Sequence, residues 1–407
     1  MSILRHARAL ALLGAVATAV PSSVIAQPVT TTAAEKPATA GFDFSGLAFG
    51  SLSYRSDSAT KLANGGKDRP QFNLDRVYFT FRMPAGEDVS IRATTDVFQQ
   101  SPSTYYAGWA IRMKYAYVQY NFLHDIGGNK GFNAQARVGL LHHVSIDHYE
   151  TFWPRYLEQT DIERNGFASS SDLGAALTVT LPDKWGEVYA TVVNGAGYTS
   201  GETDRFKDYA FRLSLTPFAG MTGTGLFKTL TISPWASSGA SASGHQNDVA
   251  SGTNNGPVPD GLNKDRFGVL VGNKDRALTF AVNWSQRKES LESGANTVAS
   301  PLVKADTSGT VTSGFVVLRP AELLDRSQKS PWGVIFRYDN FVPKDNAVAG
   351  TGGAAPSQQR TIAGLFWEPN AHTTLTLDYQ GLDYSNYALA AKPAVQSTVF
   401  LHWYVTF

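Results

Sequence analysis

The last eleven residues of the 407-residue chain carry the pattern that most restricts its fold. Apolar residues recur at every second position there: Val399, Leu401, Trp403, Val405 and Phe407. Polar residues stand between them: Thr398, His402 and Thr406. Side chains of a strand alternate between two faces, so this segment is predicted to be a strand with one apolar and one polar face. An ordinary sheet strand is the alternative, although a soluble protein rarely stops on the final aromatic of such a strand.

The first 26 residues have the features of a secretory signal peptide. Arg5 and Arg8 precede an apolar run from Ala9 to Val20, and the small-residue pattern Val24-Ile25-Ala26 follows. The apolar run is too short to cross a bilayer as a helix, and no later stretch approaches the roughly 20 apolar residues that a spanning helix needs. We therefore predict a signal peptide over 1–26, a flexible leader over 27–41 and one domain over 42–407.

Charge and cysteine content exclude several classes of protein. The chain has 35 Lys and Arg residues against 34 Asp and Glu residues, and it has no cysteine. A nucleic-acid-binding protein would carry a strong positive excess, so no nucleic-acid partner is expected. Disulfides and thiolate metal sites are impossible. The mean hydropathy of −0.19 agrees with a transmembrane barrel, in which only alternate residues face lipid.

Alternating segments recur through the domain. Sixteen are predicted, at 44–54, 72–83, 88–98, 110–122, 133–143, 172–181, 186–195, 207–217, 226–236, 264–273, 277–287, 309–319, 332–342, 359–368, 373–382 and 397–407. Each has about the 9–11 residues that a tilted strand needs to cross the hydrocarbon layer. The phase of the alternation is unclear in 44–54, 226–236 and 359–368.

The lengths of the connections decide the architecture. Tight turns at 83–88, 181–186, 273–276 and 368–372 alternate with longer polar stretches, although 123–132 and 319–331 are longer than the other links at the tight-turn end. A helical turn is predicted at Ala321–Asp325. Outer-membrane barrels have short periplasmic turns and long extracellular loops, and their closure leaves no strand edge unpaired in lipid. The prediction is an all-β fold, a porin-like 16-stranded antiparallel transmembrane β-barrel.

A barrel of this size encloses a water-filled channel. The alternation places eight basic residues on the pore side: Arg82, Arg92, Arg112, Lys114, Arg137, Arg212, Arg287 and Arg337. It places five acidic residues there: Asp96, Glu187, Asp208, Asp339 and Asp378. A basic excess favours anions. In the alternative, these charges pair across strands and only brace the wall, as Arg337 could do with Asp339.

The 28-residue stretch 144–171 is predicted to fold inward as a constriction loop. Its charged residues have both signs and include Asp147, Glu150, Arg155, Glu158, Asp161 and Arg164. Aromatic residues lie among them at Phe152, Trp153 and Tyr156. An exposed surface loop, or one that caps a neighbouring subunit, is the alternative.

Several short motifs resemble those of the phosphate-selective porins of the O and P type. They are Arg137-Val138-Gly139-Leu140, Asp172-Leu173-Gly174, Val193-Asn194-Gly195-Ala196-Gly197-Tyr198, Lys207-Asp208-Tyr209-Ala210-Phe211-Arg212 and Thr216-Pro217-Phe218. The resemblance covers roughly 133–218 and implies a trimeric outer-membrane channel. Two positions depart from the family. Leu141-His142-His143-Val144 stands where a Lys and a Pro-Phe pair are usual, and Ser171 stands where an Arg is common. Phosphate selectivity therefore does not follow from the motifs.

These features together favour a passive diffusion porin in the outer membrane of a Gram-negative-type bacterium, with a preference for anions that includes phosphate as a candidate. Its expected partners are outer-membrane lipid and lipopolysaccharide, small anionic or polar solutes, the barrel-assembly machinery and two further copies of the chain. The alternative is a plugged structural or adhesive barrel. No enzyme activity, cofactor or metal is expected. The one dense cluster, around His142 and His143, has adjacent histidines that point to opposite faces of a strand.

The predicted architecture has a direct spectroscopic test. Detergent-solubilised protein should show heat-modifiable migration on gels and a far-ultraviolet spectrum dominated by β-structure. A helix-rich spectrum from the mature chain would contradict the barrel.

Overall fold

The computed structural model describes residues 41–100, 108–126, 131–202, 204–221, 225–241, 261–293, 303–344, 356–385 and 395–407. The predicted signal peptide (1–26) and all but the last residue of the predicted leader (27–41) lie outside these ranges. In the described part of the chain, no helix has the length and apolar character needed to cross a membrane.

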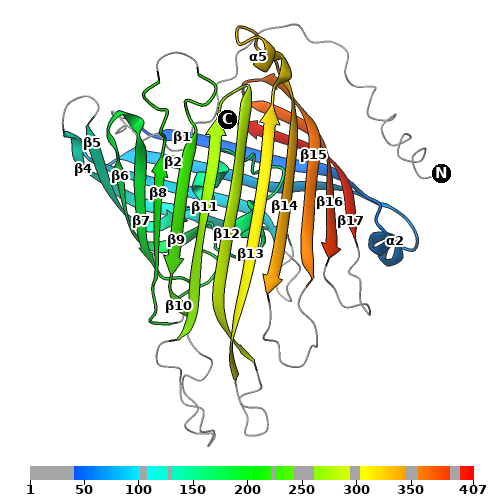
Figure 1. Ribbon diagram of the computed structural model, residues 1–407, viewed down its shortest axis with the longest axis horizontal. Helices are drawn as coiled ribbons and strands as arrows, with labels where there is room; N and C mark the ends of the chain where they lie inside the picture. Colours follow the sequence, from blue (N-terminus) through cyan, green and yellow to red (C-terminus); the bar gives the residue numbers. More distant parts are fainter. Residues whose placement is uncertain are drawn as a thin grey trace, which may run out of the picture.

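One closed antiparallel β-sheet forms the body of the molecule (Figure 1). Its first half consists of β1 (Asp43–Arg55), β2 (Arg69–Pro84), β3 (Val89–Gln100), β4 (Gly108–Ile126), β5 (Phe132–His142), β6 (Ser171–Thr180), β7 (Gly186–Val193) and β8 (Asp208–Leu215). Its second half consists of β9 (Thr231–Ser238), β11 (Leu262–Lys274), β12 (Leu278–Ser293), β13 (Val303–Leu318), β14 (Trp332–Lys344), β15 (Ser357–Asn370), β16 (Thr373–Ser385) and β17 (Gln396–Thr406). The two-residue β10 (Ala240–Ser241) continues β9 after Gly239, and both pair with β11. With β9 and β10 counted as one, the barrel therefore has 16 strands around its circumference, as predicted.

The first and last strands close the barrel. β1 and β17 pair from Leu47–Thr406 to Arg55–Thr398. Beyond this ladder, the Gly46 N–H donates to the Phe407 carbonyl at 2.7 Å and the Phe407 N–H donates to the Gly46 carbonyl at 2.9 Å. The Phe407 ring also covers Gly46, where a Cβ atom would lie 2.4 Å from the ring. The C-terminal residue thus seals the seam with both its backbone and its side chain.

The predicted strands agree with the observed ones except at a few ends. β9 begins five residues later than predicted, at Thr231, and β12 and β13 extend well beyond the predicted ends into the stretch 288–308. Their hairpin projects from the end of the barrel opposite α5 (Pro320–Leu324), which forms the predicted helical turn (Figure 1). We call the end with α5 the short-turn end and the opposite end the long-loop end, where α2 (Ser58–Ala63) follows β1.

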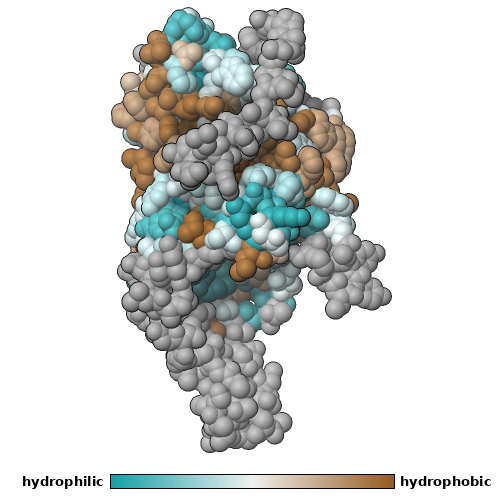
Figure 2. All heavy atoms as spheres, turned by 90° about the vertical axis from the view of Figure 1, so that its right-hand side faces the viewer, coloured by the Kyte–Doolittle hydropathy of each residue, from teal (hydrophilic) through white to brown (hydrophobic). Residues whose placement is uncertain are grey.

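The outer surface carries the apolar residues of the alternating segments. Exposed side chains on the first strands include Ile111, Val118, Leu173, Leu177 and Phe211. Figure 2 shows an apolar band on one face of the barrel, with hydrophilic residues gathered beyond it toward the long-loop end. A surface of this kind matches the lipid-facing belt of a transmembrane barrel.

One β-bulge changes which residues of β4 face the interior. Thr94 of β3 pairs with Tyr115, whereas the next residue, Thr95, pairs with Met113, so Lys114 is the extra residue. Lys114 and Tyr115 are both buried, and Tyr117 is buried as well. Bulges redirect side chains in this way. Strict alternation from Lys114 would have placed both tyrosines outside.

The closure predicts a specific role for the last residue. Phe407→Ala should reduce the amount of assembled, heat-modifiable barrel several-fold. Export should stay intact, because the variant leaves the predicted signal peptide (1–26) unchanged. Val399→Ala on the same strand is the matched control, since Val399 is also exposed and apolar but pairs with Tyr54 at the other end of the β1–β17 ladder, away from Gly46. Equal barrel levels for both variants would contradict this role.

Candidate functional site: the lumen and the loop inside it

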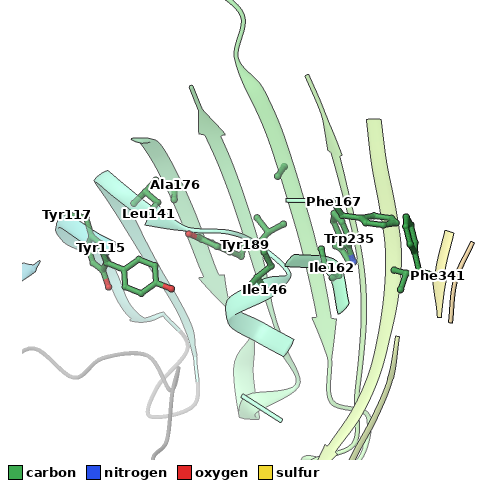
Figure 3. Close-up of a cluster of buried hydrophobic side chains, with 13 residues drawn as sticks. Tyr115, Tyr117, Leu141, Ile146, Ile162, Phe167, Ala176, Tyr189, Trp235 and Phe341 are labelled. Carbon is green, nitrogen blue, oxygen red and sulfur yellow. The ribbon is translucent and has the colours of Figure 1, made fainter. Parts of the chain in front are cut away.

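The chain between β5 and β6 lies inside the barrel. It contains α3 (Ile146–Glu150) and α4 (Asp161–Arg164), and we call residues 143–170 the lumenal loop. Figure 3 shows Ile146 and Ile162 of this loop within the curve of the strands, beside Tyr189, Trp235 and Phe341. Tyr149 and Phe167 are fully buried and Trp153 is nearly so, although none belongs to a strand. The loop is therefore part of the interior of the barrel.

Polar contacts fix the lumenal loop to the strands across the barrel from β5. Two are contacts between hydroxyl groups: Tyr149 Oη lies 2.9 Å from Ser313 Oγ, and Tyr156 Oη lies 2.8 Å from Thr376 Oγ1. In two others a wall residue donates to a carbonyl of the loop: Gln380 Nε2 donates to Leu157 at 3.0 Å, and Arg337 Nη1 donates to Gln159 at 2.8 Å. In the fifth, Asn283 Nδ2 donates to Asp161 Oδ2 at 2.6 Å. The partners belong to β12, β13, β14 and β16. The loop thus spans the lumen and is held on its far side.

Apolar packing reinforces these contacts. Trp153 and Leu157 pack with Phe315, Ile335 and Ile362 of β13, β14 and β15. The Trp153 and Phe315 ring centroids are 5.0 Å apart at an interplanar angle of 63°. Such edge-to-face pairs add stabilisation beyond the burial of their surface. One side of the loop therefore packs against strands of the second half of the barrel.

The charges between the loop and this wall are paired. Arg337 is fully buried, its Nε and Nη2 lie 2.8 Å from the Asp339 carboxylate, and its guanidinium lies 4.5 Å from the Trp153 ring centre. Glu158 Oε2 lies 3.0 Å from Arg360 Nη1. Burial raises the pKa of Asp161 to about 7, and the nearby Asp339 carboxylate adds to this effect. These groups brace the loop against the wall; the alternative interpretation named the Arg337–Asp339 pair but had it brace the wall alone.

The other side of the loop faces an open cavity of about 1,580 Å³. The cavity extends from the loop to the short-turn end, where Lys184, Lys274 and His372 line it. Loop residues from Asp147 to Tyr156 form one boundary, and β1 to β4 form the facing wall. The cavity therefore lies between the lumenal loop and the short-turn end, and beside the loop it is bounded by β1 to β4.

Of the eight basic residues predicted to line the pore, three from the wall border this cavity: Arg92, Lys114 and Arg212. Arg92 lies over the Tyr115 ring at 5.4 Å, and Lys114 Nζ lies 3.3 Å from the Tyr78 hydroxyl. Arg212 has a largely structural setting, because it contacts the Glu187 carboxylate and donates to the Val144 carbonyl at 2.5 Å.

The other five basic residues have different surroundings. Arg82 lies 3.4 Å from Asp43, and Arg137 donates to Gln119 at 2.8 Å. Arg112 is 3.0 Å from Asp96, and Arg287 donates to the Asn165 carbonyl at 3.0 Å. Arg337 is the buried brace described above.

The charged loop residues also divide by position. Asp147, Glu150 and Arg155 line the cavity. Glu158, Asp161 and Arg164 belong to the braced side: Arg164 Nη1 lies 3.6 Å from Glu158, and Glu158 and Asp161 bind the wall. Arg155 lies 3.3 Å from Glu150 and also contacts Glu163, so the loop neutralises much of its own charge.

Sequence reasoning missed the aromatic residues of the cavity wall. Phe49, Tyr78, Tyr115 and Tyr404 all line the cavity. Tyr78 has the same parity as Arg82, and Tyr404 has the same parity as His402, so the predicted pore-side phase already contains both tyrosines, whereas Tyr115 depends on the bulge.

The histidine cluster separates in space. The His142 ring lies against Tyr115 at 3.8 Å between centroids, His143 Nδ1 is 3.2 Å from Ser145 Oγ, and His148 Nε2 is 2.8 Å from Ser233 Oγ. Within the described ranges, no group of three or more His, Cys, Asp or Glu residues could hold a metal ion.

A closed 16-stranded barrel whose long loop lies in the lumen defines a porin-like architecture. Solved structures with this fold include OmpF of Salmonella typhi in complex with daunomycin (12% identity, 90% of this chain and 97% of that chain, TM-score 0.54). They also include an anion-selective porin from Comamonas acidovorans (9% identity, 90% of this chain and 99% of that chain, TM-score 0.54). A third is the outer membrane channel DcaP of Acinetobacter baumannii (13% identity, 90% of this chain and 97% of that chain, TM-score 0.56). At these identities the likeness shows the fold alone. No protein-family model matches the sequence, and no curated protein matches it.

The brace between loop and wall predicts a large effect of removing one buried charge. Arg337→Met leaves Asp339 buried without its cation, which should cost about 3–5 kcal/mol and lower the temperature at which the barrel unfolds on gels. The double variant Arg337→Met/Asp339→Leu should recover much of this loss. Arg112→Met is the control, because Asp96 keeps Arg76 at 3.1 Å and the change should cost about 1 kcal/mol or less. Equal unfolding temperatures for the two single variants would contradict the brace.

Proposed function

We propose that the protein is an outer-membrane diffusion channel for small hydrophilic solutes with a preference for anions. The observation that carries the proposal is the cavity between the free side of the lumenal loop and β1 to β4. A loop fixed to one wall narrows the lumen without filling it, and the cavity beside the other wall is the proposed path for solute.

The charge of the cavity supports the preference for anions. Nine basic side chains border it: Arg92, Lys114, Arg155, Lys184, Arg212, Lys228, Lys274, Arg276 and Arg319. Six acidic side chains do so: Asp147, Glu150, Asp183, Glu187, Asp275 and Glu368. Low-dielectric walls focus such an excess onto the pore, and salt screens it over about 8–10 Å. Phosphate is one of the anions that this charge would admit.

The cellular setting follows from the same proposal. The predicted signal peptide would direct export, and the outer apolar band would contact outer-membrane lipid and lipopolysaccharide. The Phe407 strand would be the signal for the barrel-assembly machinery, and the resemblance to phosphate-selective porins suggests a homotrimer. The channel itself needs no cofactor or catalytic residue.

Reversal potentials across planar bilayers under a salt gradient test the preference. Wild type should favour anions, most strongly in dilute salt. Arg92→Gln should move the reversal potential toward cations, because it removes a charge from the cavity wall. Arg112→Gln removes the same charge outside the cavity lining and should have a smaller effect. A barrel that never opens would support a plugged structural protein instead, and a cation-selective wild type would mean that the acids dominate.

A further inference from the structure

We propose that the cavity contains a binding site for aromatic carboxylates, such as benzoate, formed by aromatic side chains of β17, β1 and β2 beside Lys114 and Arg92. This inference rests on the proposed channel function and names a class of solute for it. Its basis is the juxtaposition of ring faces and cations on one wall of the cavity.

The aromatic part of the site is a platform made by neighbouring strands. Phe49 of β1 is the register partner of Tyr404 of β17, and Tyr78 of β2 lies edge-on to Phe49 with ring centroids 6.2 Å apart. Tyr156 of the lumenal loop stacks on Tyr404 at 5.1 Å and 29°. All four rings border the cavity. Tyr156 is held in place by its hydroxyl contact with Thr376, so the loop itself completes the platform.

Cations adjoin this platform directly. Lys114 Nζ is 3.3 Å from the Tyr78 hydroxyl and 4.8 Å from the centre of its ring. In the part of the chain that the structure describes, no carboxylate lies within ion-pair distance of Lys114. Arg92 enters the cavity from β3 beside Tyr115. The wall therefore presents positive charge next to Tyr78 and ring faces beyond it.

This arrangement discriminates by combining two weak interactions. A carboxylate beside Lys114 gains a charge-assisted hydrogen bond and the favourable field of the nearby Arg92 guanidinium, and a ring attached to it can pack edge-to-face or offset against Phe49 and Tyr404. Acetate and phosphate would use only the cations. A neutral ring or sugar would use only the platform. An aromatic carboxylate uses both, so it should reside longest in the cavity.

Block of the chloride current tests the site in the full-length barrel in planar bilayers. Benzoate should reduce the current at concentrations at least about ten-fold below those of acetate, inorganic phosphate or benzyl alcohol. The readout is the ratio of half-blocking concentrations for benzoate and acetate, which cancels any change in the open conductance. Maltose serves as a neutral probe of the platform.

Variants assign the effect to the platform and the cation. Phe49→Leu and Tyr404→Leu keep apolar bulk but remove a ring, and each should bring the ratio closer to one. Lys114→Gln should weaken benzoate block several-fold while the block by benzyl alcohol stays the same. Trp185→Leu is the control, because Trp185 is an aromatic residue of the same cavity in the turn before β7 and should leave the ratio unchanged.

The outcomes separate this inference from the proposed channel. Open channels with equal block by benzoate and acetate would overturn the aromatic site and leave the channel intact. Stronger block by maltose than by benzoate would overturn it in favour of a carbohydrate site. A ratio that moves toward one in Trp185→Leu but not in Phe49→Leu would also overturn it. A barrel without conductance would contradict both proposals.

Discussion

A strand in contact with lipid has no water to satisfy its backbone, so each of its N–H and C=O groups needs a partner within the protein. The sheet meets this requirement by closing on itself through β1 and β17, and the two bonds between Gly46 and Phe407 extend the closure to the last residue. The β8–β9 ladder shows the cost of an exception. Its pairing lapses between Arg212–Trp235 and Leu215–Ile232 with the register unchanged, and Pro234, which has no N–H to donate, lies in this gap. Inside the barrel, Ser233 Oγ and Ser214 Oγ bond at 3.0 Å and His148 of the lumenal loop contacts Ser233.

Closure of a barrel this wide leaves an interior space, and the lumenal loop occupies part of it. A 16-stranded barrel is too wide for wall side chains to fill, so its interior stays wet unless another part of the chain enters it. The loop enters asymmetrically. Its buried aromatic residues and the Arg337–Asp339 pair commit one side of it to β12–β16. The opposite side keeps Glu150 and Arg155 facing the cavity. The same contacts that stabilise the loop therefore determine where the cavity lies.

Much of this fold could be predicted because period-two alternation and the parity of connection lengths are local properties of the sequence. The alternation alone predicted the inward orientation of Arg92, which borders the cavity, and of Asp339, which pairs with Arg337 inside the barrel. The bulge at Lys114 could not be predicted, because nothing in the residue pattern marks the point where Thr94 pairs with Tyr115 and Thr95 with Met113. The partners of the loop were equally inaccessible. Tyr149 and Ser313 are 164 positions apart, and only the curvature of the barrel brings them together.

The position of a charge, more than its sign, then determines what it contributes to the channel. Arg212 has inward parity and borders the cavity, yet its guanidinium contacts Glu187 and holds the Val144 carbonyl at the start of the loop. Reversing its charge would disturb the loop as well as the field, so a change in selectivity there would have two causes. Lys114 differs, because its neighbours are the Tyr78 hydroxyl and aromatic rings. Lys114 borders the cavity, and the bulge that contains it also turns Tyr115 toward the same cavity. The irregularity in β4 thus supplies both a charge and part of the aromatic wall of the cavity.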